Sequence, residues 1–139
     1  MPEPSLLTPL LSSRPSPGSF PSPLLLWRTG ASFVAAGMIA GAFGAHALKS
    51  KAGITPDQVS AFTTAAHYAI YNGLGLCMVS LHPRFSTHRF AGPAIALGGF
   101  IFSTSIMALV FNKERARLFG PVTPLGGMLA IAGYISLAF

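Results

Sequence analysis

Four long intervals without a charged residue divide this chain and most constrain what it can fold into. They contain no Asp, Glu, Lys or Arg, and they cover residues 29–48, 58–83, 90–112 and 118–139. At about 1.5 Å per residue, each is long enough to cross the roughly 30 Å of hydrocarbon in a bilayer. Because backbone amides inside lipid must bond within their own segment, such intervals are expected to be helical. The sequence therefore predicts an all-α membrane protein, with four transmembrane helices in a compact antiparallel bundle.

Residues that favour helix starts refine the bounds of two intervals. Thr55, Pro56 and Asp57 are typical of an N-cap, a first-turn proline and an acid near the positive end of the helix dipole. Thr123 and Pro124 form a second candidate cap and first turn inside the last interval. The expected spans are about 29–48, 55–81, 90–112 and 118–139.

The region before the first span has a different composition. Seven of the 12 prolines lie within the first 23 residues, together with many serines. Proline prevents a continuous helix, so residues 1–27 are predicted to be a disordered tail and residues 28–139 the four-span membrane domain. The arginines and the single acid of this tail faintly resemble a mitochondrial presequence, although the prolines oppose the amphipathic helix of such a signal. A secretory signal cleaved after Ala47 is the alternative, but its apolar part would be unusually long.

The formal net charge of +6 comes from nine basic and three acidic residues, and the bases beyond the tail lie in or beside loops. This distribution indicates contact with lipid headgroups and gives no nucleic-acid footprint. Basic residues are nearly balanced between the two sides, so the orientation stays open. Cys77 is the only cysteine, which excludes an internal disulfide.

Small residues at steps of four predict where helices pack closely. The first span carries the pair Gly37 and Gly41, and Ile70 of the second span is expected on the opposite, lipid-facing side of the small-residue stripe. The stripe of the second span consists of Ala61, Ala65, Ala69 and Gly73. Such faces favour contact within the chain, with a second copy or with other membrane proteins.

A group of polar residues is expected near the middle of the membrane, where the second and third spans reach the same depth. Its members are His67, Tyr68, Tyr71, Asn72, Ser103 and Ser105. Ionisable groups inside a membrane are candidates for a proton or small-solute path. The competing interpretation is a neutral histidine that hydroxyl groups satisfy and that only supports packing. The lack of an acid, lysine or arginine within the spans favours the second interpretation.

No catalytic or cofactor site follows from the sequence. A haem between His46 and His67 would require both ligands at one depth, but the two positions differ by about 12 to 15 Å along their helices. No metal-ligand spacing, nucleophile motif or phosphate loop is present, so we expect no cofactor and no enzymatic activity.

Four motifs resemble a known family. GAFGAHALK, TTAAHYAIYNGLGL, FSTSIMAL and FGPVTPLGGMLAIAGY follow one another along residues 29–139. In this order they resemble the domain of unknown function 423 family, the transmembrane protein 256-like small membrane proteins. The signature residues are Gly41, Gly44, His46, Pro121, Thr123, Pro124, Gly126 and Gly127. The resemblance implies a multi-pass membrane protein without an established activity, and its animal members are associated with mitochondria.

The predicted function is therefore that of a small multi-pass membrane protein that serves as a structural or assembly component of its membrane. The mitochondrial inner membrane is the leading location. The alternative is a small channel or transporter that uses the polar cluster around His67. His46 is expected at the membrane interface, where it would cap the end of the first helix.

Overall fold

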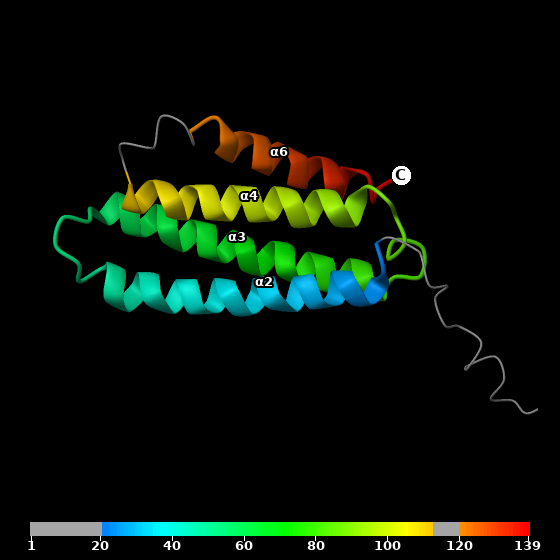
Figure 1. Cartoon of the computed structure of the whole chain (residues 1–139), viewed down its shortest axis with the longest axis horizontal. Helices are drawn as coiled ribbons and strands as arrows, with labels where there is room; N and C mark the ends of the chain where they lie inside the picture. The colour runs from blue at the N-terminus through cyan, green and yellow to red at the C-terminus, as the bar shows by residue number, and fades with distance from the viewer. Residues whose placement is uncertain (1–20, 113–119) are drawn as a thin grey trace, which may run out of the picture.

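Helices form all the regular secondary structure of the described residues. The computed structural model describes residues 21–112 and 120–139, within which no strand occurs. The first helix, α2, covers Pro23–Phe43 and continues into a π-helical segment, η1, at Gly44–Leu48. It is followed by α3 (Pro56–Leu81), α4 (Ala91–Phe111) and α6 (Val122–Ile135), which alternate in direction along the long axis (Figure 1).

The starts of α2 and α3 follow from capping residues. Ser22 Oγ accepts a hydrogen bond from the amide of Leu25, and proline occupies the first turn of α2. Thr55 and Gln58 form a capping box, in which Thr55 Oγ1 accepts from the Gln58 amide and Gln58 Oε1 accepts from the Thr55 amide. The Gln58 side chain also donates to the carbonyl of Val110 at 3.0 Å, which ties the start of α3 to the end of α4.

The observed bounds agree with the expected second and third spans and differ at the other two. Helix α2 begins at Pro23, so residues 23–27, assigned to the tail, are helical. Arg28 is the boundary predicted from charge, but its side chain is exposed, and a long arginine can lie within a helix while its charge reaches water. The part of the predicted tail before residue 21 lies outside the described residues.

The last helix is shorter than expected. Helix α6 has 14 residues, about 21 Å at 1.5 Å per residue, where the sequence predicts a span over 118–139. Pro121 stands at the N-cap position, where Thr123 was expected; Thr123 and Pro124 are the second and third residues of the helix, so Pro124 lies in the first turn as predicted. Residues 113–119, which include the start of the predicted span, lie outside the described residues.

The helices are arranged as two pairs. Helix α2 packs along α3, α4 packs along α6, and the two pairs meet where α3 packs on α4. The α2 and α4 backbones approach each other only slightly, and those of α2 and α6 do not come close. The described helices therefore form an open row of two pairs, whereas the sequence predicts a compact antiparallel bundle.

Glycines allow the backbones within each pair to touch. A Cβ added at Gly73 would lie 2.6 Å from the carbonyl oxygen of Gly30, so α2 and α3 are in direct backbone contact. A Cβ added at Gly98 would likewise collide with the backbones of Gly126 and Ala130, which joins α4 to α6. Side chains larger than hydrogen would hold the helices of each pair further apart.

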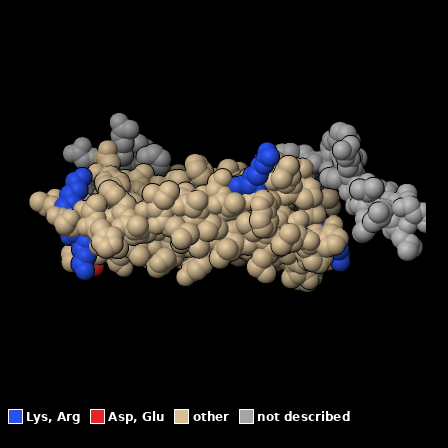
Figure 2. Space-filling model, turned by 90° about the horizontal axis from the view of Figure 1, so that it is seen from below, with Lys and Arg blue, Asp and Glu red and all other residues tan. Residues whose placement is uncertain are grey.

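Buried apolar clusters lie toward the two ends of the molecule, and apolar side chains also cover its outside. One cluster consists of Leu26, Leu76, Val79 and Ile95, and the other of Leu48, Phe62 and Val110. Many large apolar side chains are exposed, among them Met38, Ile39 and Met78. On the face in Figure 2, basic side chains lie at the ends and at one place between them, acidic atoms are visible at one end, and uncharged residues cover the rest of the described surface.

Candidate functional site

The predicted polar cluster is divided in the structure. His67, Tyr68 and Tyr71 are exposed side chains of α3, and the Tyr71 ring lies about 6 Å from the rings of the other two. The Tyr68 ring also packs edge-on against Phe102 of α4, at a centroid distance of 5.1 Å. No hydrogen bond joins His67 to Ser103 or Ser105, and both serines are buried on α4. The prediction of one internal cluster around His67 is therefore wrong, because α3 directs His67 away from the serines of α4.

Asn72 is the member of this set that lies inside the α3–α4 interface. Its side chain is buried, and Nδ2 donates to the carbonyl oxygen of Tyr68 at 2.9 Å on its own helix. The amide packs against Gly99, at which an added Cβ would lie 2.9 Å from the Asn72 Cγ. Asn72 thus serves the contact between the two helix pairs.

Ser105 links α4 to α6. Its hydroxyl donates to the carbonyl of Phe102 at 3.0 Å, and the hydroxyls of Ser105 and Thr123 are 2.8 Å apart. Either hydroxyl can donate to the other, because each is both a donor and an acceptor. The threonine of the GPVTP motif is therefore an interhelical contact.

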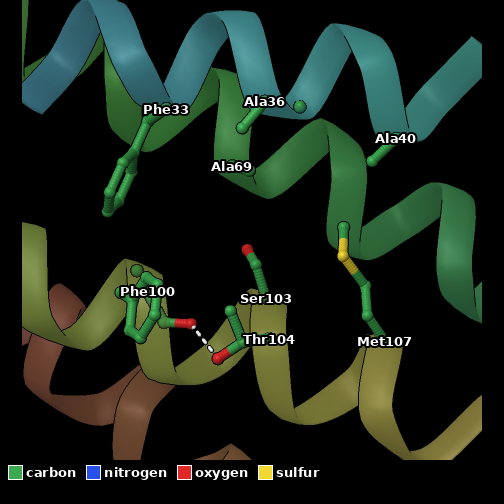
Figure 3. A pocket seen from close by; sticks show the side chains of 10 residues that line it. Phe33, Ala36, Ala40, Ala69, Phe100, Ser103, Thr104 and Met107 are labelled. Atoms are coloured by element: carbon green, nitrogen blue, oxygen red, sulfur yellow. Dashed lines mark hydrogen bonds between the residues drawn. The ribbon is translucent and has the colours of Figure 1, made fainter.

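Ser103 has a different environment. It is the thirteenth of the 21 residues of α4, its exposed fraction is 4%, and its hydroxyl has no hydrogen-bond partner in the described part of the chain. Figure 3 shows this hydroxyl directed away from α4, into the space that α2 and α3 border. No other buried side-chain nitrogen or oxygen of residues 21–112 and 120–139 lacks a partner in this way.

The space in front of Ser103 is a cavity between α2, α3 and α4, with a volume of about 150 Å³. Phe33 and Phe100 border one end, with ring centroids 6.4 Å apart, and Met107 borders the other (Figure 3). The remaining lining residues are small or hydroxylated: Ala36, Gly37, Ala40, Ala69, Gly99 and Thr104. We call this space the Ser103 cavity.

A second cavity of about 250 Å³ lies between α3, α4 and α6. Tyr68, Asn72 and Tyr134 contribute polar groups to its lining, and Phe102 and Ile131 contribute apolar ones. The Tyr134 side chain reaches across to Gly75 of α3. The two cavities therefore lie at the junction of the helix pairs, one beside α2 and one beside α6.

The GAFGAH signature coincides with the π-helical segment. Gly44 is buried, and an added Cβ would lie 3.0 Å from the Phe62 ring, while Gly41 is only partly buried. The His46 side chain is exposed. At this helix end the Ser50 hydroxyl donates to the main-chain carbonyl oxygen of His46, with 3.1 Å between the two oxygens. The side-chain cap expected of His46 is thus supplied by Ser50, which the sequence analysis did not consider. Such π segments are frequent at functional sites.

The predicted packing residues have several environments. Gly37 and Gly73 lie in the α2–α3 contact, and Ala65 is buried. Ala61 packs at the edge of the cluster around Phe62, and Ala69 lines the Ser103 cavity.

Ile70 was expected to face lipid, but it packs on Gly37, because α3 turns the Ala66 and Ile70 side toward α2. The missed signal is a seven-residue repeat on α2: Gly30, Gly37 and Gly44 are all buried against α3. This is the repeat that keeps one seam of a helix facing its partner.

The signature residues near the C-terminus position α6. Gly126 touches the α4 backbone at Phe102 and Gly98, and Gly127 faces the Phe102 ring. Pro121 precedes the first turn of α6. No group of three His, Cys, Asp or Glu side chains suited to a metal occurs among the described residues.

Comparison with known proteins finds one matching family and several similar membrane proteins. Residues 40–127 match the sequence profile of the family described as "Protein of unknown function (DUF423)". A UPF0382 membrane protein of Schizosaccharomyces pombe is 31% identical over 70% of this chain and 84% of its own length. UPF0382 membrane proteins of Staphylococcus haemolyticus and Staphylococcus epidermidis are 35% and 34% identical, over 70% of this chain and 78% of each relative. No solved structure matches the chain.

Proposed function

Because this chain belongs to the DUF423 family, whose curated relatives are named membrane proteins, we propose that it crosses a membrane four times and serves there as a structural or assembly component. Two segments are long and apolar enough to span a membrane by themselves, Pro23–Leu48 and Ala91–Phe111. Only 17% of the most apolar window of the first is buried, so its apolar surface faces outward, unlike that of a core helix in a water-soluble protein.

The alternation of the helices supports the four crossings. Helices α2 and α4 run in the same direction, and α3 returns between them (Figure 1). If α2 and α4 both cross the bilayer, α3 crosses it in the opposite sense. Helix α6 packs along α4 and runs back beside it, which makes it the fourth crossing. Charged residues suit this arrangement, because Lys49 and Lys51 follow the end of α2 and Arg84 and Arg89 lie between α3 and α4.

The observation that carries the structural role is that, apart from the Ser103 hydroxyl, the buried polar side chains of the described helices are bonded within their own helix or to a neighbouring helix. Asn72 and Thr104 donate to carbonyls of their own helices, and Ser105 contacts Thr123. Aspartate, glutamate and lysine are absent from the interior of the described helices, where a proton relay would require titratable partners. The alternative path around His67 loses its geometric basis, because His67 lies on the exposed side of α3.

The outer surface favours lipids and other membrane-spanning helices as partners. Exposed apolar side chains occur on every described helix, and the His67, Tyr68 and Tyr71 side chains add a polar aromatic group to the outside of α3. Aromatic and imidazole groups on a lipid-facing helix can bond to a neighbouring helix. We propose contacts with itself or with other membrane proteins through this side of α3, and no contact with nucleic acid.

We keep the mitochondrial inner membrane as the proposed location in a eukaryotic cell. The support is the resemblance to animal members associated with mitochondria. The relatives in staphylococci mean that the family as a whole is not confined to mitochondria.

Labelling of single cysteines on the two sides of α3 tests whether this helix crosses the membrane, as the proposed alternation requires. In a Cys77→Ala background, Lys51→Cys and Arg89→Cys are placed in sealed vesicles and exposed to a membrane-impermeant maleimide. We expect one to react from outside and the other only after the membrane is opened. Reaction of both from the same side would contradict the proposed crossings.

Loss of the protein tests the assembly role. Membranes from cells with and without it are compared on native gels, and we expect one membrane assembly to decrease and to return with the wild-type chain and with His67→Gln. Unchanged assemblies, together with proton or solute flux through reconstituted protein that His67→Gln abolishes, would instead support the channel alternative.

A further inference from the structure

The Ser103 hydroxyl is a buried polar group without a partner in the described residues, and it points into a cavity (Figure 3). Burial of an unpaired hydroxyl is unfavourable. A trapped water molecule would need about two to four polar partners. The cavity offers only one other hydroxyl, Thr104, which already donates to the Phe100 carbonyl at 2.6 Å. The Ser103 cavity is therefore poorly suited to water and suited to a largely apolar molecule that presents a hydrogen-bond acceptor to Ser103.

The size and the ends of the cavity restrict the shape of that molecule. Its volume is about 150 Å³. An engineered apolar cavity of about 150 Å³ in another protein holds benzene, so a six-membered ring fits a space of this size. The rings of Phe33 and Phe100 border one end and offer an aromatic contact to such a ring, and the thioether of Met107 borders the other.

The cavity opens sideways. Ala36, Phe100 and Thr104 are exposed at the outer surface, whereas Gly37, Gly99 and Ser103 are buried behind them. The opening lies where α2 and α4 approach each other only slightly. Because Ser103 stands near the middle of α4, a ligand would enter from the hydrocarbon of the bilayer and not from water.

We propose that the Ser103 cavity binds the ring of a lipophilic quinone, with Ser103 Oγ donating a hydrogen bond to a ring carbonyl. A quinone combines a six-membered ring, a carbonyl acceptor and solubility in the bilayer interior. A saturated acyl chain lacks the acceptor, and the ester carbonyls of a phospholipid lie near the interface, far from the middle of α4. The inference goes beyond the structural role, concerns binding alone, and requires neither the assembly role nor a redox step.

The test uses the full chain in lipid nanodiscs and two probes with the same ten-carbon tail. Decylubiquinone carries ring carbonyls, and decylbenzene carries none. Affinity is measured from the concentration dependence of the thermal unfolding midpoint. A photoactivatable decylubiquinone followed by peptide mass spectrometry locates the bound ring, and we expect labelling within residues 33–40 and 99–107.

Two variants distinguish the contribution of the Ser103 hydrogen bond to binding from the contribution of the room in the cavity. Ser103→Ala keeps the cavity and removes the donor, so decylubiquinone should bind about fivefold more weakly while decylbenzene binds at least as well as before. Ala36→Leu partly fills the mouth and should weaken both probes at least tenfold. Ser32→Ala and Ala35→Leu are the matched controls, because both positions are exposed on α2 and outside the lining, and neither should change either affinity.

Each other outcome overturns the proposal. Equal binding of the two probes, unaffected by Ser103→Ala, would mean that the cavity holds only hydrocarbon. Quinone binding that neither Ser103→Ala nor Ala36→Leu weakens, or labelling confined to other peptides, would place the site elsewhere. Absence of binding by a chain that unfolds cooperatively would mean that the cavity closes in the bilayer.

Discussion

The contacts within each helix pair differ from the contacts between the pairs. Within the pairs, backbone touches backbone, at Gly30 and Gly73 in one and at Gly98 and Gly126 in the other. Between the pairs, side chains meet, as where Asn72 packs on Gly99 and Tyr134 reaches Gly75. The Ser103 cavity and the cavity beside Tyr134 both lie at this second kind of contact.

This difference has a physical cause. In lipid, helices gain no hydrophobic energy from association, so close packing and interhelical hydrogen bonds decide which pairs are tight. Backbone contact at a glycine leaves no room for a ligand, whereas a contact through side chains leaves spaces that a rotamer change can alter. The pairs are therefore expected to act as rigid units, and binding is expected where they meet.

The largest expected effect is at Gly98. Gly98→Ala places a methyl group against the α6 backbone, which cannot yield unless the helices separate, and we expect a loss of about 3 kcal/mol in stability. Thermal unfolding in mild detergent measures it. Gly41→Ala is the control, since its nearest neighbour would be the Ala66 Cβ at 3.9 Å, and its effect should stay within about 1 kcal/mol. Equal losses from the two substitutions would contradict backbone contact as the basis of the pair.

The next effect concerns the hydrogen bond inside the α4–α6 pair. Ser105→Ala removes the hydrogen bond with Thr123 and should cost about 1 kcal/mol, typical of hydrogen bonds between membrane helices. The same unfolding measurement applies. Thr123→Ser, which keeps the hydroxyl, should retain most of the stability. A larger loss in Thr123→Ser than in Ser105→Ala would show that the threonine methyl group matters more than the hydrogen bond.

A smaller effect is expected at Gly75, between the pairs. Gly75→Ala would also create a collision, but with the end of the Tyr134 side chain, which can rotate toward the surface. We expect a loss below about 1 kcal/mol, in contrast to the same substitution at Gly98. Changed accessibility of Tyr134 to a water-soluble phenol reagent in detergent would report the rotation. A cost at Gly75 equal to that at Gly98 would remove the distinction between the two kinds of contact.

The smallest effect, and the one with opposite sign, is expected at Ser103. Without a quinone present, Ser103→Ala removes an unpaired buried hydroxyl, so stability should stay the same or rise by up to about 1 kcal/mol. Thermal unfolding of the ligand-free protein checks this. A clear loss of stability would mean that the Ser103 hydroxyl makes a hydrogen bond within the protein and does not point unpaired into the cavity.

The bounds of α3 and α4 were predictable because local signals define them. Thr55 and Pro56 form the expected cap and first turn, and charged residues stand close to both ends of the 90–112 interval. The start of α2 was not predictable from the charge pattern. Arg28 was expected to precede the apolar helix, but α2 begins at Pro23, because a long arginine side chain can extend from within a helix to water. Charge-free intervals thus indicate where the helices of the described residues lie better than where they begin and end.

The positions of the candidate site residues along their helices were predictable, but the directions in which their side chains point were not. Ser103 lies in the middle of its helix as expected, yet the faces of α3 could not be assigned from its sequence. His67 and Asn72 share one arc of an isolated helix, but α3 packs on both α2 and α4, so only Asn72 is covered. In a helix that is apolar on nearly all sides, partner choice depends on glycine contacts between distant segments, and these follow only from the three-dimensional arrangement.

The short length of α6 affects the surrounding bilayer. With 14 residues it spans about 21 Å, whereas its neighbour α4, with 21 residues, spans about 31 Å. If both cross the same membrane, the hydrophobic mismatch differs on the two sides of the protein. Lipids beside α6 have to thin or tilt, at a fraction of a kcal/mol per Å. The protein would consequently accumulate where the bilayer is thin, and the thinned side gives a second copy or another protein with a short helix a favourable place to associate.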